Sequence, residues 1–164
     1  MVAFMAVDNK VIRMQILDAV PQQHPFRFID DILELDEERI TGRYRFREDE
    51  YFYRGHFPGR PITPGVILIE TMAQTGVVAF GLYLKMVQQE VSVEEIKRLT
   101  TLFTLAEAVE FTGIVRPGET VITRGEKVYF RKDSLKVRVI MQRENGDVVC
   151  SGVLAGTGVH DDKI

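Results

Sequence analysis

The sequence predicts an α+β fold in which a curled antiparallel sheet of five to six strands wraps around one long buried helix. Two observations support this prediction. Residues 64–87 have a helical pattern that is apolar on almost every side, and such a helix must be enclosed by other elements. From residue 99 onward, short segments alternate apolar and polar residues, which is typical of strands with one buried face.

The predicted strands lie on both sides of the helix in the chain. Two precede it, at 26–35 and 39–47, and four follow it, at 99–115, 120–130, 134–144 and 147–159. Asn145-Gly146 is a hairpin signal, and Pro117-Gly118 marks another turn. Residues 105–111 alone also fit a helix, but they are too few to displace the strand prediction.

Length and composition indicate one globular domain spanning residues 1–164, with a short N-terminal helix at about 10–19. The net charge of −3 argues against a general nucleic-acid binder. The single cysteine, Cys150, excludes an internal disulfide framework and is compatible with a reducing cytoplasm. Its alternating neighbours predict a packed strand residue rather than a nucleophile.

Two apolar segments raise the question of a membrane. Residues 1–10 lack a basic start and are a poor signal peptide. Residues 66–84 have nearly the length of a membrane span, but Glu70 and Gln74 would be costly in lipid. We therefore expect a buried helix in a cytoplasmic protein.

The loop before the central helix holds His56 among prolines and glycines. Pro58 and Pro61 each fix a backbone angle, so this loop is expected to be stiff. We predict Thr63 as the helix N-cap and Pro64 as the first helical residue. The N–H of Gly65, at the positive end of the helix dipole, is then suited to bind a carbonyl oxygen as it gains charge.

Glu70 shares a helix face with apolar residues and with Gln74, whose amide lies one turn further on. Burial there would raise the pKa of its carboxyl and suit it to act as a general acid. The alternative for Glu70 is a solvent-facing position, and for His56 a structural hydrogen bond. Together a base, a buried acid and an oxyanion donor fit removal of a proton α to a carbonyl with loss of a β-hydroxyl. No metal-ligand spacing and no phosphate-binding glycine fingerprint occur in the sequence.

Three blocks of this sequence resemble the bacterial 3-hydroxyacyl-(acyl-carrier-protein) dehydratases of the FabZ type, which have the hotdog fold. They are "HPFRFID", "GHFPGRPITPGVILIETMAQ" and, more weakly, "FTLAEAVEFTGIVRPGE". The resemblance implies dehydration of a (3R)-3-hydroxyacyl thioester in fatty-acid or related polyketide or polyene biosynthesis. It implies that His56 is the base and that Glu70 is the acid, supplied by the other protomer of a homodimer.

The resemblance also implies that Gly65 binds the thioester carbonyl, and we expect the other substrate-binding residues to be Pro64, Val66, Phe57 and Gln74. It implies no cofactor, and a homodimer or a hexamer built as a trimer of dimers. The substrate would be carried by acyl carrier protein or by coenzyme A.

Some positions depart from the family pattern. Arg27 stands where an apolar residue is usual, and Ala108 and Glu110 replace two basic residues, which puts recognition of the carrier in doubt. Two other functions stay open at this point: a hotdog acyl-thioester hydrolase, and a non-catalytic paralogue that binds acyl thioesters.

Overall fold

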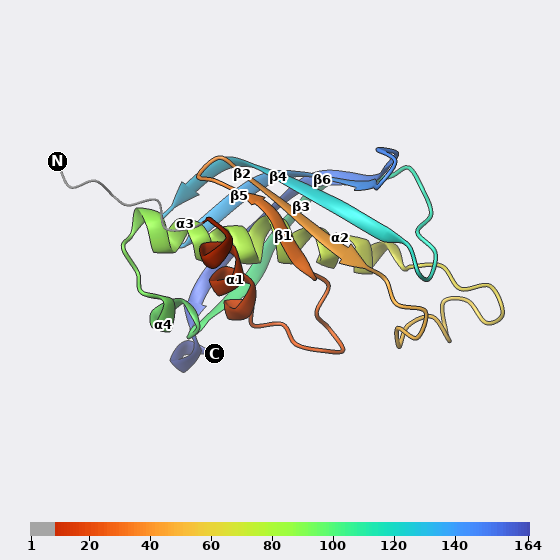
Figure 1. Ribbon diagram of the computed structural model, residues 1–164, viewed down its shortest axis with the longest axis horizontal. Helices are drawn as coiled ribbons and strands as arrows, with labels where there is room; N and C mark the ends of the chain where they lie inside the picture. The colour runs from red at the N-terminus through yellow and green to blue at the C-terminus, as the bar shows by residue number, and fades with distance from the viewer. Residues whose placement is uncertain (1–8) are drawn as a thin grey trace.

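A computed structural model describes residues 9–164 of the protein. Residues 1–10, which we predict to be a poor signal peptide, lie mostly outside the described residues. The six strands are β1 (Asp31–Leu35), β2 (Arg39–Arg45), β3 (Leu99–Phe111), β4 (Thr120–Arg131), β5 (Ser134–Arg143) and β6 (Val148–His160). They form one antiparallel sheet in the order β1-β2-β4-β5-β6-β3, so β1 and β3 are its edges. The predicted fold class is confirmed (Figure 1).

The central helix runs from Gly65 to Gln88 beneath the sheet. It comprises α2 (Gly65–Ala73), the π-helical segment η1 (Gln74–Ala79) and α3 (Phe80–Gln88). The sequence predicted the helix but not its wider middle turn. Residues of that turn touch the sheet where the sheet has glycines: a Cβ on Gly156 would lie 2.5 Å from Val77, and one on Gly42 would lie 2.6 Å from Thr75. Glycine at these two positions lets the helix and sheet approach closely.

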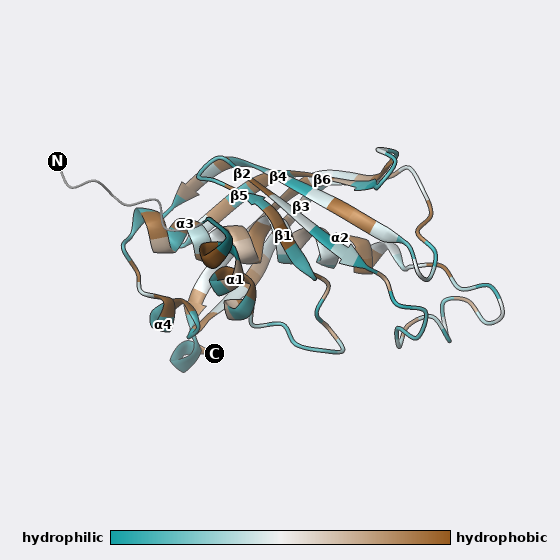
Figure 2. Ribbon diagram, in the orientation of Figure 1, coloured by the Kyte–Doolittle hydropathy of each residue, from teal (hydrophilic) through white to brown (hydrophobic). Residues whose placement is uncertain are grey.

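By length and composition the central helix could cross a membrane, but 72% of its most apolar stretch is buried inside the fold. Figure 2 shows hydrophobic colour recurring along this helix and on the strands above it. The predicted alternation in β5 is confirmed, since Leu135, Val137, Val139 and Met141 are all buried against the core. The helix is therefore the core element that the sequence predicted.

The first predicted strand was too long. We expected residues 26–35, whereas β1 begins at Asp31. The physical reason is that Phe26 and Phe28 bond through their backbones to the Gln74 side chain instead of to a neighbouring strand. The two predicted turns are confirmed: Gly118 and Gly146 have positive φ, and the chain reverses at each of them.

Three short helices complete the described structure. They are α1 (Asn9–Ala19), α4 (Val93–Ile96) and η2 (Asp161–Lys163). The first was predicted within one residue. The second begins with a capping box between Ser92 and Glu95, in which each side chain accepts from the backbone N–H of the other residue. Cys150 is buried in β6 as predicted, and burial raises the pKa of its thiol to about 11.

Candidate active site

The loop that carries His56 leaves β2 and is fastened at its start and its end. Near its start, the hydroxyl of buried Tyr44 donates to the carboxylate of Glu50, which also accepts from the Arg47 backbone N–H at 3.2 Å. Near its end, the Tyr53 and Thr63 hydroxyls are 2.6 Å apart. These bonds hold the loop in addition to the prolines that the sequence showed, and we did not predict them.

His56 is oriented by its own loop. Its Nδ1 lies 3.0 Å from the carbonyl oxygen of Ile62. Because a carbonyl oxygen only accepts hydrogen bonds, Nδ1 carries the proton in the neutral imidazole, and the lone pair is then on Nε2. The ring also stacks on Phe57, with 4.2 Å between ring centroids, and the peptide bond joining these two residues is cis. The imidazole is thus held in the tautomer that a base requires.

The start of the central helix differs from the prediction by one residue. Pro64, not Thr63, is the N-cap, and the helix begins at Gly65. The Thr63 side chain cannot cap the helix because it bonds to Tyr53, while its N–H donates to the Val115 carbonyl at 2.8 Å. The Ile67 N–H donates to the Pro64 carbonyl at 2.9 Å. The N–H of Gly65 comes before any helical carbonyl that it could bind, and the helix dipole makes this end positive.

Gly65 lies directly against the ring of Phe111, the last residue of β3. A Cβ at position 65 would be 3.0 Å from two carbon atoms of that ring. A side chain at position 65 would therefore require the Phe111 ring or the helix N-terminus to shift by a few tenths of an ångström.

Glu70 is partly buried on the next turn of the helix. Burial raises the pKa of its carboxyl, and a hydrogen bond from Gln74 opposes this by stabilising the charged form. The donor Nε2 of Gln74 is 2.9 Å from Oε1 of Glu70. The predicted contact between this acid and the amide one turn later is therefore confirmed.

The Gln74 amide is itself held by a segment far away in sequence. Its Oε1 accepts from the Phe28 backbone N–H at 2.6 Å, and its Nε2 donates to the Phe26 carbonyl at 2.9 Å. Gln74 is fully buried, and all its hydrogen-bonding groups are used. No periodicity or spacing in the sequence pointed to this contact.

Two expected substrate-binding residues lie on the surface of the single chain. Val66 is 71% exposed, although we expected it on the buried face of the helix, and Phe57 is 44% exposed beside His56. Between His56 and Glu70, both described, no hydrogen bond forms within one chain. The site as predicted thus consists here of two parts: the loop histidine, and the helix with its acid.

A family model described as a FabA-like domain matches residues 20–155, which include every residue of this site. The chain belongs to the FabA-like family. Two curated relatives bear the name 3-hydroxyacyl-[acyl-carrier-protein] dehydratase FabZ. The protein from Caldicellulosiruptor bescii is 34% identical over 141 residues, covering 85% of this chain and 93% of the relative. The protein from Acetivibrio thermocellus is 36% identical over 151 residues, covering 92% and 96%.

Solved structures share the fold of this FabA-like chain. The dehydratase heterocomplex ApeI:P from Xenorhabdus doucetiae has a TM-score of 0.72 at 11% identity, covering 90% of this chain and 92% of that one. A hypothetical thioesterase with coenzyme A from Streptococcus pneumoniae has a TM-score of 0.53 at 11% identity, covering 79% and 85%. At these identities the similarity establishes the fold and not the reaction.

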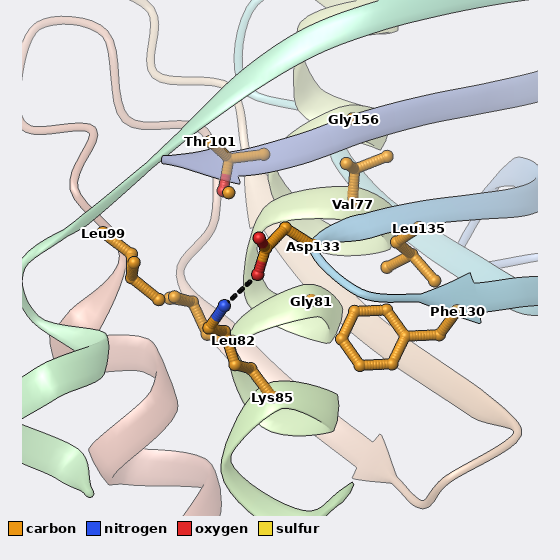
Figure 3. Close-up of a pocket in the computed structure, with 11 residues that line it drawn as sticks. Val77, Gly81, Leu82, Lys85, Leu99, Thr101, Phe130, Asp133, Leu135 and Gly156 are labelled. Carbon is orange, nitrogen blue, oxygen red and sulfur yellow. Dashed lines mark hydrogen bonds and ion pairs between the residues drawn. The ribbon is translucent and has the colours of Figure 1, made fainter. Parts of the chain in front are cut away.

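A small cavity lies beside the second half of the central helix, at Gly81 and Leu82 (Figure 3). No residue of the His56 loop lines it. It measures about 20 Å³, the space of a single water molecule. Its walls are mainly apolar, from Val77, Leu82 and Leu135, and Lys85 forms an ion pair with Asp133 at its side. Nothing in these walls suggests chemistry, so the FabA-like chain has its candidate site at the N-terminal end of the helix.

Proposed function

We propose that this protein catalyses the reversible dehydration of a (3R)-3-hydroxyacyl thioester, carried by acyl carrier protein, to the trans-2-enoyl thioester in fatty-acid biosynthesis. The curated dehydratases that match it over most of their length support this function. The observation that carries the proposal is Glu70: a carboxyl whose pKa is raised by burial, in the second turn of a helix that begins at Gly65.

In this reaction Nε2 of His56 takes a proton from the α-carbon of the substrate. The electron pair of that C–H bond forms the new double bond, and the bond from the β-carbon to oxygen breaks. Glu70 gives its proton to the departing hydroxyl, which leaves as water. The Gly65 N–H stabilises the thioester oxygen while it holds negative charge. No metal or organic cofactor is required, because the base, acid and oxyanion donor are all protein groups.

We further infer that the working enzyme is a homodimer in which His56 of one protomer acts with Glu70 of the other. The supporting feature is β3, an edge strand thirteen residues long whose outer edge is unpaired in the described chain. Three large apolar residues on it, Leu102, Phe103 and Phe111, are each 45–50% exposed. A long apolar edge strand is a site where a second chain pairs. The mass of the assembly in solution tests whether three such dimers form a hexamer.

The carrier of the acyl group is a separate question. Ala108 and Glu110, which replace the basic residues of the family pattern, are both exposed on β3. Ala108 has a positive φ of 50° at a bulge in that strand. A surface without those cations attracts an acidic carrier protein less strongly. We keep acyl carrier protein as the proposed carrier and the cytoplasm as the proposed location.

The test is hydration of a crotonyl thioester, followed by loss of its ultraviolet absorbance, with the carrier-protein and coenzyme A forms side by side. Thiol release is recorded in the same samples. Hydration that disappears in His56→Ala but persists in His160→Ala supports the proposal, since His160 is exposed at the end of β6. Thiol release without hydration would instead establish a hydrolase, and neither activity across several chain lengths would indicate a non-catalytic protein.

Mixing inactive variants tests the shared site. His56→Ala and Glu70→Gln chains, unfolded together and refolded, would form mixed dimers with one intact site if the pair spans the interface. Random pairing makes about half of the dimers mixed, and each mixed dimer has one of its two sites intact, so recovery of about a quarter of wild-type activity supports the inference. Proven exchange without any recovery would place the site within one chain.

A further inference from the structure

Arg27, which departs from the family pattern, reaches back to the end of α1. Its Nη2 donates to the Leu17 carbonyl at 2.6 Å, and its Nη1 lies 3.4 Å from the carbonyl oxygens of both Val20 and Gln22. The last turn of α1 contains no basic residue of its own. Carbonyls at a helix end lack partners within the helix and favour a nearby cation. Arg27 therefore supplies the cation that α1 lacks.

The residues on either side of Arg27 are the two that hold Gln74. The Phe28 N–H binds the Gln74 amide oxygen, and the Phe26 carbonyl accepts from the amide nitrogen. With its oxygen fixed by Phe28, the amide can direct its remaining N–H only toward Glu70. Arg27 lies between these two residues, so anchoring its side chain holds in place both backbone groups that orient the Gln74 amide.

We propose that Arg27 is a positioning residue for Glu70: it anchors segment 26–28 to the end of α1, and this segment orients the Gln74 amide that donates to the Glu70 carboxyl. This inference rests on the proposed role of Glu70 as the acid. It assigns Arg27 no contact with the substrate. Ordering a loop residue costs backbone entropy, so a segment without its anchor samples more conformations.

The electrostatics separate this positioning effect from a direct charge effect. Within residues 9–164, burial and the Gln74 hydrogen bond are the influences on the pKa of Glu70, and no charged side chain adds to them. Segment 26–28 itself carries Arg27, and its neighbours His24 and Asp30 likewise contribute nothing to Glu70. Removing the Arg27 charge therefore changes the titration of Glu70 only if the Gln74 contact changes.

Arg27→Met is the test, and Arg13→Met is its matched control. Arg13 also ties α1 to the body of the protein through a carbonyl, that of Leu33 at β1, but it lies far in sequence from segment 26–28. The titration of Glu70 is followed by NMR of protein labelled with ¹³C in its glutamate carboxyls, assigned with Glu70→Gln. We expect Arg27→Met to raise the pKa of Glu70, because a hydrogen bond that favours the charged form is weakened. We expect kcat to fall about tenfold with little change in KM. Arg13→Met should change neither.

A double mutant tests the route. If Arg27 acts through Gln74, then Arg27→Met has no further effect on the Glu70 titration in a Gln74→Met background. Arg27→Lys keeps the charge but loses the forked donor, so an intermediate effect is expected, and this variant serves if Arg27→Met does not fold.

The inference would be overturned if the Arg27 and Arg13 variants lose thermal stability equally and the Glu70 titration is unchanged in both. Arg27 would then only cap the end of α1. An undiminished effect in the Gln74→Met background would exclude the route through Gln74. The Glu70 titration is measured without substrate and does not need turnover. An inactive wild type would therefore refute the proposed reaction, and the titration would still decide the role of Arg27.

Discussion

Gln74 donates a hydrogen bond to Glu70 across one turn of the central helix, with 2.9 Å between Gln74 Nε2 and Glu70 Oε1. The carbonyl oxygen of a neutral carboxyl is a stronger acceptor than its hydroxyl oxygen, so this bond favours the acidic proton on the other oxygen. The proton of neutral Glu70 therefore resides on Oε2. In the proposed reaction Oε2 is the atom that protonates the leaving hydroxyl.

Replacing Glu70 by glutamine should remove turnover while keeping the fold, because the amide has the same shape but no acidic proton. General acid catalysis contributes about 10²–10⁴-fold, so kcat should fall by that range. The measurement is crotonyl-thioester hydration, with the circular dichroism spectrum as the check on folding. Rates within a few-fold of the wild type would remove Glu70 from the mechanism.

The pH dependence of activity should show the raised pKa of Glu70. A general acid must be protonated, so kcat/KM for the dehydration direction should decline as the pH rises through the pKa of Glu70, which lies above its ordinary value of 4.5. Profiles of kcat/KM against pH for dehydration of a 3-hydroxybutyryl thioester, recorded with wild type and with Gln74→Met, test this. Loss of the Gln74 bond should move the decline to higher pH, and an unmoved profile would contradict the assignment.

Stability should respond to pH in the same direction. A carboxyl with a raised folded-state pKa contributes stability that is fully present below its unfolded pKa and lost as the pH rises through the folded pKa. Glu70→Gln should therefore be more stable than the wild type at about pH 8 and no more stable at about pH 4. Urea unfolding at the two pH values measures this. A Glu70→Gln variant that is less stable than the wild type at both pH values would show that the negative charge of Glu70 does not destabilise the fold.

Tyr53 should matter to the His56 loop through its hydroxyl alone. Tyr53→Phe removes the bond to Thr63 and should cost about 1 kcal/mol of unfolding free energy, together with a several-fold loss of kcat. Tyr51→Phe is the control, because Tyr51 is 47% exposed in the same loop. Equal effects of the two changes, measured by denaturation and by the hydration assay, would argue against a role for the Tyr53–Thr63 bond. Burial raises the pKa of Tyr53 to about 12, so its hydroxyl stays protonated throughout these assays.

Gly65 and Gly81 should respond in opposite ways to replacement by alanine. A methyl group at position 65 would press on Phe111 at 3.0 Å, displacing the helix N-terminus, with a loss of kcat of roughly 10- to 100-fold. At position 81 the nearest atom is 3.7 Å away, an ordinary contact, and alanine in a helix should add about 0.5–1 kcal/mol of stability. Turnover and unfolding of both variants decide this, and a fully active Gly65→Ala would mean that Phe111 yields without cost.

Much of the fold was predictable because its signals are local. The apolar pattern of 64–87 and the alternation from Leu99 onward gave the central helix and four of the strands to within a few residues. The boundaries that failed have tertiary causes. Thr63 would be a good N-cap, but its hydroxyl is taken by Tyr53, and residues 26–30 have strand character, but two of their backbone groups bind Gln74.

The sequence by itself determined the fold class, the chemistry of the candidate residues and the family, since residue types, periodicity and short motifs are properties of the chain alone. It also predicted that Gln74 reaches Glu70, because residues one helical turn apart must meet. Only the tertiary structure decided what orients these groups: Ile62 for His56, Phe111 beside Gly65, and segment 26–28 for Gln74. Such partners lie up to 48 residues apart, and no local pattern records which distant backbone groups will be left to bind a buried side chain.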